Sequence, residues 1–343
     1  MQVTTIGLDL AKNVFQLHGV DADGNAVVRK KLGRAGLLVF FAKLPPCIVG
    51  IEACATAHYW ARELMALGHD VKLMPPAYVK PYVKRGKNDA ADAEAICEAV
   101  VRPTMRFVAV KSAEQQSLLM LHRSRDLLIR QRTMLANALR SHFAELGIIV
   151  AQGLRNLPKL AEIIRQEGDA RVPAIARHAL GLLVAQIEDL QGRIKDLEQA
   201  LIAWHRANDT SRRLETIPGI GVIVATAITA TVTDPHQFKS GRQFAAWLGL
   251  VPRQNSSGGK DRLGRISKMG DRYLRRLLVV GATALIRFAR NRATPLAEWA
   301  EKLLSRRPAR LVSVALANKI ARVAWALLVR GGYYGSQIAA RPA

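Results

Sequence analysis

Two aspartates, Asp89 and Asp92, lie three positions apart in the run KRGKNDAADAE of residues 84–94. On a helix this spacing puts both carboxylates on one face. Carboxylates that close repel each other unless a cation lies between them, and the usual one in an enzyme is a hard divalent ion such as Mg²⁺. The alternative is ordinary first-turn chemistry, in which Asn88 or Asp89 caps the helix and Asp92 interacts with its dipole.

The elements around this pair predict an α/β domain. Strands are expected at residues 3–10, 13–20, 26–32, 47–53 and 70–74, because these runs are apolar or alternating and an Asp-Gly turn separates the second from the third. Helices are expected near residues 37–44, 57–67 and 89–101. The order β-β-β-α-β-α-β-α is that of the RNase H fold, with a mixed sheet.

Two more acids fall at informative places in this sheet. Asp9 lies inside the first strand, in Ile-Gly-Leu-Asp, and Glu52 ends the fourth strand. An isolated carboxylate in an apolar strand is costly to bury unless it is paired or metal-bound, and α/β folds place their sites at strand ends. We therefore expect Asp9 and Glu52 to join the aspartate pair at one Mg²⁺ site. Lys12 is either a nearby counter-charge or a surface lysine of the hairpin.

Charge indicates the partner. The 343 residues, enough for two or three domains, include 51 basic and 27 acidic side chains, a formal net charge of +24. Residues 206–343 alone carry +17 of this charge. A basic excess of this size points to a polyanion, and we expect the C-terminal part to be the main nucleic-acid surface.

Cysteine usage and hydropathy indicate the compartment. Cys47, Cys54 and Cys97 are widely spaced and have no metal-ligand spacing, so they are expected to be buried thiols in a reducing cytoplasm. The N-terminus lacks the form of a signal peptide, and no uncharged apolar run reaches about 18 residues. A soluble intracellular protein with no membrane partner is expected.

The middle of the chain, residues 109–205, is expected to be a helical arm between an N-terminal domain (1–108) and a C-terminal domain (206–343). A first helix spans residues 113–146. A later one carries a heptad seam, which predicts a coiled coil, either a hairpin against the first helix or a stalk that pairs two chains. The seam residues are Leu180, Leu183, Ile187, Leu190, Ile194, Leu197, Leu201 and Trp204.

The C-terminal domain is expected to be all-α, with basic helices at residues 273–290 and 311–329. Its opening run IPGIG (217–221) resembles a helix-hairpin-helix turn, in which Gly219 and Gly221 would offer backbone N–H groups to a phosphate. The alternative is a tight turn between packed helices. The run VPRQNSSGGKDRLGRISKMG (251–270) mixes glycines, hydroxyls and cations. It is either a flexible linker or a loop that wraps a phosphate backbone and offers a serine nucleophile.

Taken in order, six motifs resemble one family. They are IGLD (6–9), GIEA (50–53), KNDAADA (87–93), IPGIG (217–221), QFAAWLGLVPR (243–253) and ISKMG (266–270). Together they cover nearly the whole chain and are similar to the DEDD-type transposases of bacterial insertion sequences, the bridge-RNA-guided recombinases.

The resemblance implies a Holliday-junction-resolvase-like N-terminal domain with Mg²⁺ on Asp9, Glu52, Asp89 and Asp92, and a C-terminal serine that becomes covalently joined to DNA. The family's Ser-Gly pair places that serine at Ser257, with Ser256 and then Ser267 as alternatives. Implied partners are donor and target DNA, a bridge RNA and further copies of the chain, as a dimer or tetramer, in the bacterial cytoplasm at the nucleoid. Candidates for clamping phosphates are Arg253, Lys260, Arg262, Arg265 and Lys268.

Two other functions remain open from the residues. The first is a metal-dependent Holliday-junction-type endonuclease that uses the four acids and water as the nucleophile. The second is a non-catalytic nucleic-acid-binding protein, for which the basic C-terminal part would suffice.

Overall fold

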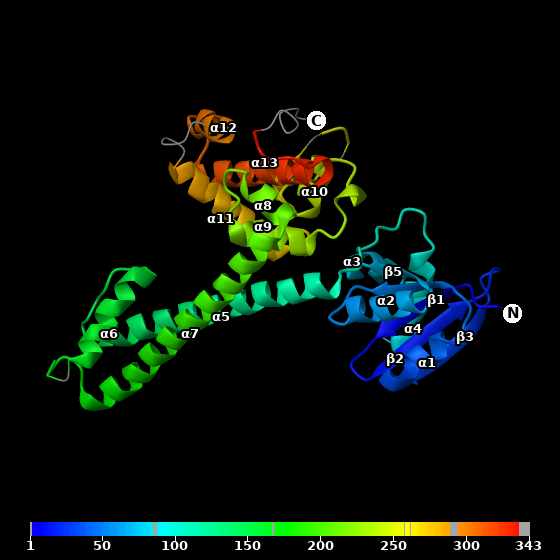
Figure 1. The fold of residues 1–343 in the computed structure, drawn as a ribbon, viewed down its shortest axis with the longest axis horizontal. Coiled ribbons are helices and arrows are strands. Elements are labelled where there is room, and N and C mark those ends of the chain that lie inside the picture. The colour runs from blue at the N-terminus through cyan, green and yellow to red at the C-terminus, as the bar shows by residue number, and fades with distance from the viewer. Residues whose placement is uncertain are drawn as a thin grey trace. The chain divides into compact units, whose positions relative to one another are not determined.

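The computed structural model describes residues 2–84, 88–166, 168–256, 258–260, 262–288 and 294–335. The chain forms two compact units that meet between Gln116 and Ser117 (Figure 1). The helical arm and the C-terminal helices fall within the second unit. The division into three domains at residues 108 and 205 stays a prediction.

The first unit is built on a mixed five-stranded sheet, as the sequence predicts. The strand order is β3-β2-β1-β4-β5; β1 runs antiparallel to β2 and parallel to β4. Strands and helices begin and end within a few residues of the expected positions. Their bounds are β1 (Thr5–Leu10), β2 (Val14–Val20), β3 (Ala26–Gly33), α1 (Leu37–Phe41), β4 (Ile48–Glu52), α2 (Ala57–Ala66), β5 (Asp70–Met74), α3 (Pro76–Val79) and α4 (Asp89–Val100).

Helix α4 covers one face of this sheet, and two glycines let it approach closely. A Cβ on Gly7 of β1 would collide with the backbone of α4 at Ala93 and Cys97, and a Cβ on Gly50 of β4 would press on the side chain of Val100. The opposite face carries the apolar core shared with α1 and α2. The α4 face is therefore the face on which the acids can meet.

The arm consists of two long helices joined through a small one: α5 (Ala113–Glu145), α6 (Leu157–Arg165) and α7 (Ala174–Ala207). Of the predicted seam, Ile187 belongs to the same apolar cluster as Leu139 of α5, and Leu201 belongs to the same cluster as Leu118. Arg125 of α5 also forms an ion pair with Glu198 of α7 at 2.6 Å. α5 and α7 therefore lie against each other in antiparallel order within one chain; a coiled coil along the whole seam and pairing between chains stay predictions.

The C-terminal part of the second unit packs its helices around one apolar core. Among the described residues, only α13 is long and apolar enough to cross a membrane by length and composition, but half of its apolar stretch is buried and it packs against α10, α11 and α12. The helices are α8 (Asp209–Glu215), α9 (Val222–Thr231), α10 (Gly241–Trp247), α11 (Arg272–Phe288), α12 (Pro295–Leu304) and α13 (Ala309–Arg330).

The expectation that this part is all-α is wrong. Residues 252–254 (β6) and 263–266 (β7) pair as an antiparallel hairpin inside the Gly- and Ser-rich run. The two strands are short, and all their side chains are exposed except that of Ile266, which is half-buried. A strand that buries neither face shows no alternation of apolar and polar residues, so the sequence carries no period-two signal there.

Candidate active site

Asp9 and Glu52 lie on neighbouring parallel strands. The register pairs Gly7 with Gly50 and Leu8 with Ile51. Successive side chains of a strand point to opposite faces, so the two acids, each two positions after a glycine that faces α4, point to the α4 side as well. This arrangement is the one expected from the strand order.

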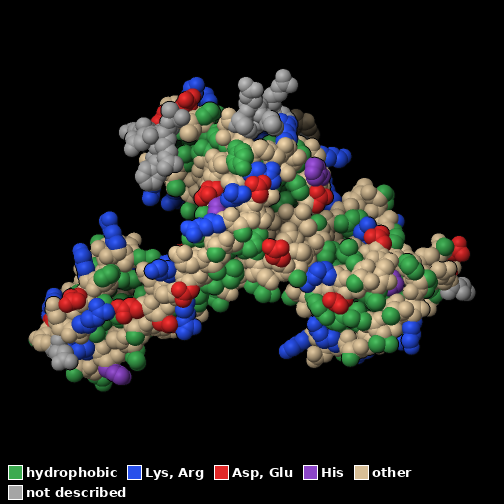
Figure 2. Space-filling view, in the orientation of Figure 1, with side chains coloured by type: hydrophobic (Ala, Val, Ile, Leu, Met, Phe, Trp, Pro, Cys, Tyr) green, Lys and Arg blue, Asp and Glu red, His purple; other side chains and the backbone are tan. Residues whose placement is uncertain are grey.

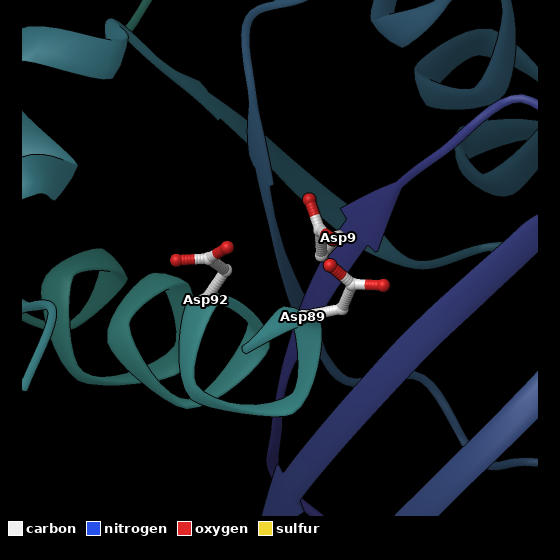
Figure 3. Close-up of side chains that lie close together, drawn as sticks. All are labelled: Asp9, Asp89 and Asp92. Atoms are coloured by element: carbon white, nitrogen blue, oxygen red, sulfur yellow. The ribbon is translucent and has the colours of Figure 1, made fainter. Parts of the chain in front are cut away.

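The other two acids lie in the first turn of α4. Asn88 caps this helix by accepting a hydrogen bond from the N–H of Ala90 at 3.0 Å, so the cap does not use Asp89. Figure 3 shows Asp89 and Asp92 extending from α4 toward Asp9 at the end of β1. One carboxylate oxygen from each of the three residues lies within 4.8 Å of the others.

The crowding of carboxylates is visible in their electrostatics. Burial, followed by the charges of Asp92, Asp89 and Glu52, raises the pKa of Asp9 to about 6. Burial and the charge of Asp92 also raise the pKa of Glu52. The charge of the aspartates therefore reaches Glu52, although Glu52 is not one of the three residues whose oxygens lie within 4.8 Å of one another.

The described basic residues do not form ion pairs with these four acids. Lys84, which precedes them, pairs with Glu94 at 2.6 Å, and Lys12 is exposed. Oxygen ligands on converging carboxylates are the set that hard divalent cations prefer. The donor atoms and their uncompensated charge thus fit a divalent metal ion.

The predicted nucleophile, Ser257, lies outside the described residues. The structure describes its neighbour Ser256, whose hydroxyl accepts a hydrogen bond from the N–H of Arg262 at 3.2 Å across the β6–β7 hairpin. Next to Ser256, the N–H of Asn255 donates to the carbonyl of Arg262 at 2.8 Å. The Ser256 hydroxyl therefore takes part in the hairpin's own hydrogen bonds, and the choice between Ser257 and Ser256 as the nucleophile stays a prediction.

The five candidate phosphate-clamping residues are exposed on or beside this hairpin: Arg253, Lys260, Arg262, Arg265 and Lys268. Arg253 donates to the carbonyl of Ser267 at 3.2 and 3.3 Å, so part of its hydrogen-bonding capacity serves the hairpin. Lys268 has a φ of 55°, a left-handed backbone conformation that residues other than glycine adopt at a cost in energy.

The residues that anchor the hairpin were not anticipated as functional. Gly249 and Gly270, at its two ends, leave room for each other's segment, since a Cβ on either would collide with the opposite backbone. The guanidinium of Arg275 in α11 donates to the carbonyls of Leu248 and Met269 at 3.0 and 3.1 Å. Gly249 and Gly270 lie in two of the family motifs, and this was the one feature of the sequence that could have pointed to them. No feature of the sequence pointed to Arg275.

The predicted helix-hairpin-helix turn joins α8 to α9. Gly219 has a φ of 91° and lies against the backbone of Gly281 in α11. A Cβ on Gly281 would collide with the carbonyl of Gly219 at 2.0 Å, and a Cβ on Gly219 would press on the side chain of Ile320 at 2.9 Å. Gly221 is exposed and is the N-cap of α9, with no side chain capping it. Gly219 therefore serves packing, and phosphate binding at this turn stays a prediction.

Comparison with known proteins identifies the family. A family model for the DEDD transposases of IS110 matches residues 6–148, and the model of the transposase IS116/IS110/IS902 family matches residues 211–297. A "Probable family 20 transposase" of Pseudomonas aeruginosa is 51% identical over 97% of this chain and 99% of its own length. The transposase for insertion sequence element IS1328 of Yersinia enterocolitica is 42% identical over 96% of this chain and 98% of its own length.

A further relative, the transposase for insertion sequence element IS1111A of Coxiella burnetii, is 40% identical and covers 97% of this chain and 91% of its own length. The two family models span the acid-bearing sheet at one end and the turn and hairpin of the C-terminal part at the other. The chain belongs to the IS110 family of DEDD transposases and is a DNA-cutting recombination enzyme of an insertion sequence.

Proposed function

We propose that this transposase cuts and rejoins DNA through a covalent phosphoserine intermediate, with Mg²⁺ held by Asp9, Glu52, Asp89 and Asp92. The observation that supports it most strongly is the convergence of three aspartate oxygens within 4.8 Å, together with the pKa of Asp9 raised to about 6. Carboxylates packed this closely repel one another, and a cation held between them offsets the repulsion.

The four acids would hold the metal and position it against the scissile phosphate, and bound Mg²⁺ would supply positive charge to the phosphate oxygens. Ser257 would attack the phosphorus through its Oγ. The new Oγ–P bond replaces the phosphodiester P–O bond of the DNA strand, which leaves with a free hydroxyl, while the serine proton passes to a base. That hydroxyl would later attack a phosphoserine linkage in another strand and release the serine.

We also propose that the enzyme acts as a dimer or tetramer through its arm. The inner seam of α7 is already occupied by α5 of the same chain, so an outer face would pair the copies. On α5, Met120, Leu127 and Met134 recur every seven residues and are 61%, 46% and 70% exposed. A heptad of exposed apolar side chains is typical of a helix that pairs with another.

We further propose a bridge RNA as the guide that sets DNA specificity, at the nucleoid of the bacterial cytoplasm. The support is the +17 charge of residues 206–343. On the face shown in Figure 2, basic side chains are scattered over the arm and the C-terminal helices with acidic ones among them, instead of forming one continuous patch. Scattered cations suit contacts to a folded backbone over a broad area.

The test is a denaturing gel with mass spectrometry, on protein expressed with its flanking non-coding DNA and supplied with Mg²⁺ and element-end DNA. Wild type should form a covalent protein–DNA adduct, and Ser257→Ala and Asp92→Asn should not. Ser256→Ala and Glu94→Gln are the matched controls, one a neighbouring serine and the other an acid on the same helix, and both should retain the adduct.

The rival function is a metal-dependent endonuclease that uses water. It predicts cleaved DNA without an adduct, and cleavage unchanged in Ser257→Ala. That result would overturn the serine mechanism and leave the metal site in place.

A further inference from the structure

The register of the sheet places polar and basic side chains in line with the acids. Asp9 of β1 pairs across to Gln16 of β2, and Gln16 pairs across to Lys31 of β3. Residues paired directly across a sheet share a face. One row on the α4 face therefore runs from Glu52 through Asp9 and Gln16 to Lys31 at the edge of the sheet.

The adjacent row confirms which face this is. Gly7 pairs with His18, and His18 pairs with Arg29 of β3. A Cβ on Gly7 would meet the backbone of α4 at Ala93 and Cys97, so the side chains of this row point to the α4 face. Arg29, and Lys31 two positions later, therefore point to the α4 face.

Lys30 points the other way. Its ammonium lies over the ring of Phe40, 5.2 Å from the ring centroid, on the face that packs with α1. β3 thus carries three consecutive basic residues, two on the acid-bearing face and one on the opposite face. Arg29 and Lys31 are exposed, and neither forms an ion pair within the described part of the chain.

We propose that the β2–β3 face beside the acids is the path of the DNA strand being cut, with Lys31 and Arg29 contacting its phosphates and Gln16 lying between them and Asp9. Strands lie about 4.8 Å apart, so the Cα of Lys31 is roughly 10 Å from that of Asp9. A lysine side chain reaches from there toward the phosphates that flank one held at the acids. This inference rests on the proposed function, because it requires that the acids are where the strand is cut.

Charge balance supports this assignment. An uncompensated carboxylate cluster repels a polyanion, so a strand can approach it only where nearby cations offset the repulsion. The row from Asp9 reaches such cations within two strands. A basic edge strand also prevents edge-to-edge association of sheets, but that role would be served equally by Lys30 and does not require its neighbours to face the acids.

The test measures the salt dependence of DNA binding in full-length Lys31→Ala, Arg29→Ala and Lys30→Ala proteins. Binding of a fluorescein-labelled single-stranded DNA of mixed sequence is followed by anisotropy in EDTA over a series of KCl concentrations. Each phosphate contact contributes about 0.7 to the slope of log affinity against log salt for a single strand. We expect the slope to fall by about 0.7 in Lys31→Ala and in Arg29→Ala, and to stay unchanged in Lys30→Ala.

Equal slopes in Lys31→Ala and Lys30→Ala would overturn the inference. It would also be overturned if Lys31→Ala changed the slope for an RNA of the same sequence and not for the DNA, because the face would then belong to RNA. EDTA removes metal from the assay, so its outcome is independent of the adduct gel. A changed slope without adduct would support the DNA path and reject the serine mechanism. Adduct formation with an unchanged slope would support the serine mechanism and reject the DNA path.

Discussion

Gly7 is the position at which a single methyl group should disable the metal site without touching an acid. A Cβ there would lie 2.1 Å from the carbonyl oxygen of Ala93 and 2.4 Å from the N–H of Cys97. Both atoms belong to the backbone of α4, which cannot yield by rotating a side chain. To bring the nearer contact from 2.1 Å to at least 3.0 Å, α4 must move by about 0.9 Å.

That movement should be felt at the acids, because Ala93 directly follows Asp92. Displacements of about 1 Å at a catalytic site cost on the order of a hundredfold in rate. Overpacking of this kind also costs about 1 to 3 kcal/mol of stability. We expect Gly7→Ala to lose about a hundredfold in adduct formation and to bind Mn²⁺, used as a probe for Mg²⁺, markedly more weakly in calorimetry.

Gly50→Ala is the matched control. Gly50 lies under the same helix, but its Cβ would meet the side chains of Val100 and Ile96 at 2.9 to 3.2 Å, far from the first turn. The nearest atom, the Cβ of Val100, moves only with α4, but a shift of about 0.1 Å brings this contact to 3.0 Å. Metal binding should therefore be close to that of wild type, and only stability should fall. If Gly7→Ala bound Mn²⁺ as wild type does, or Gly50→Ala lost as much, the helix contact would not be what places the acids.

Three further predictions concern the second unit. Burial lowers the pKa of His122 to about 4. On acidification from pH 6.5 to about pH 5, His122 therefore takes up a proton in the unfolded chain but not in the folded one. The free energy of unfolding, measured by urea titration, should fall by about 2 kcal/mol more in wild type than in His122→Phe. Arg275→Leu removes two hydrogen bonds from a charged group, each worth about 1.5 to 3 kcal/mol. It should therefore speed hydrogen exchange of the β6–β7 hairpin by about a hundredfold or more, whereas Arg272→Leu should not. Leu201 is fully buried in the arm, so Leu201→Ala should lower the free energy of unfolding by about 2 to 5 kcal/mol. Leu182 is 62% exposed, so Leu182→Ala should lower it by less than about 0.5 kcal/mol. Equal losses would contradict the packing of α7 on α5.

Much of the first unit could be predicted because β1, β2, β4 and β5 bury side chains and therefore appear in the sequence as apolar runs. The five strands and α4 fall within two residues of their expected ends. The meeting of Asp9 with Asp92 followed from element order, since the first strand of this fold is central and α4 must cross it. What spacing could not show is why α4 comes so close. The close approach depends on Gly7 and Gly50, and their role can be seen only once the sheet and α4 are placed against each other.

The C-terminal part was less predictable for two physical reasons. The β6–β7 hairpin exposes nearly all its side chains, so hydrophobic periodicity could not indicate it. Arg275 holds the hairpin by donating to the carbonyls of Leu248 and Met269, 27 and 6 residues away in the sequence. In the sequence it cannot be told from an arginine on the surface of a helix. The hydrogen bonds from Arg253 to the carbonyl of Ser267 could not be predicted for the same reason.

The antiparallel pairing of α5 with α7 has a consequence for how this gene can change. Leu118 near the start of α5 and Leu201 near the end of α7 lie in one cluster, so the two points at which the arm is attached to the rest of the chain lie side by side. Deleting or inserting matched heptads in both helices would shorten or lengthen the arm and leave these two attachment points unchanged. Insertions and deletions among relatives should therefore concentrate toward the far end of the arm, near α6, and come in sizes that preserve the seam.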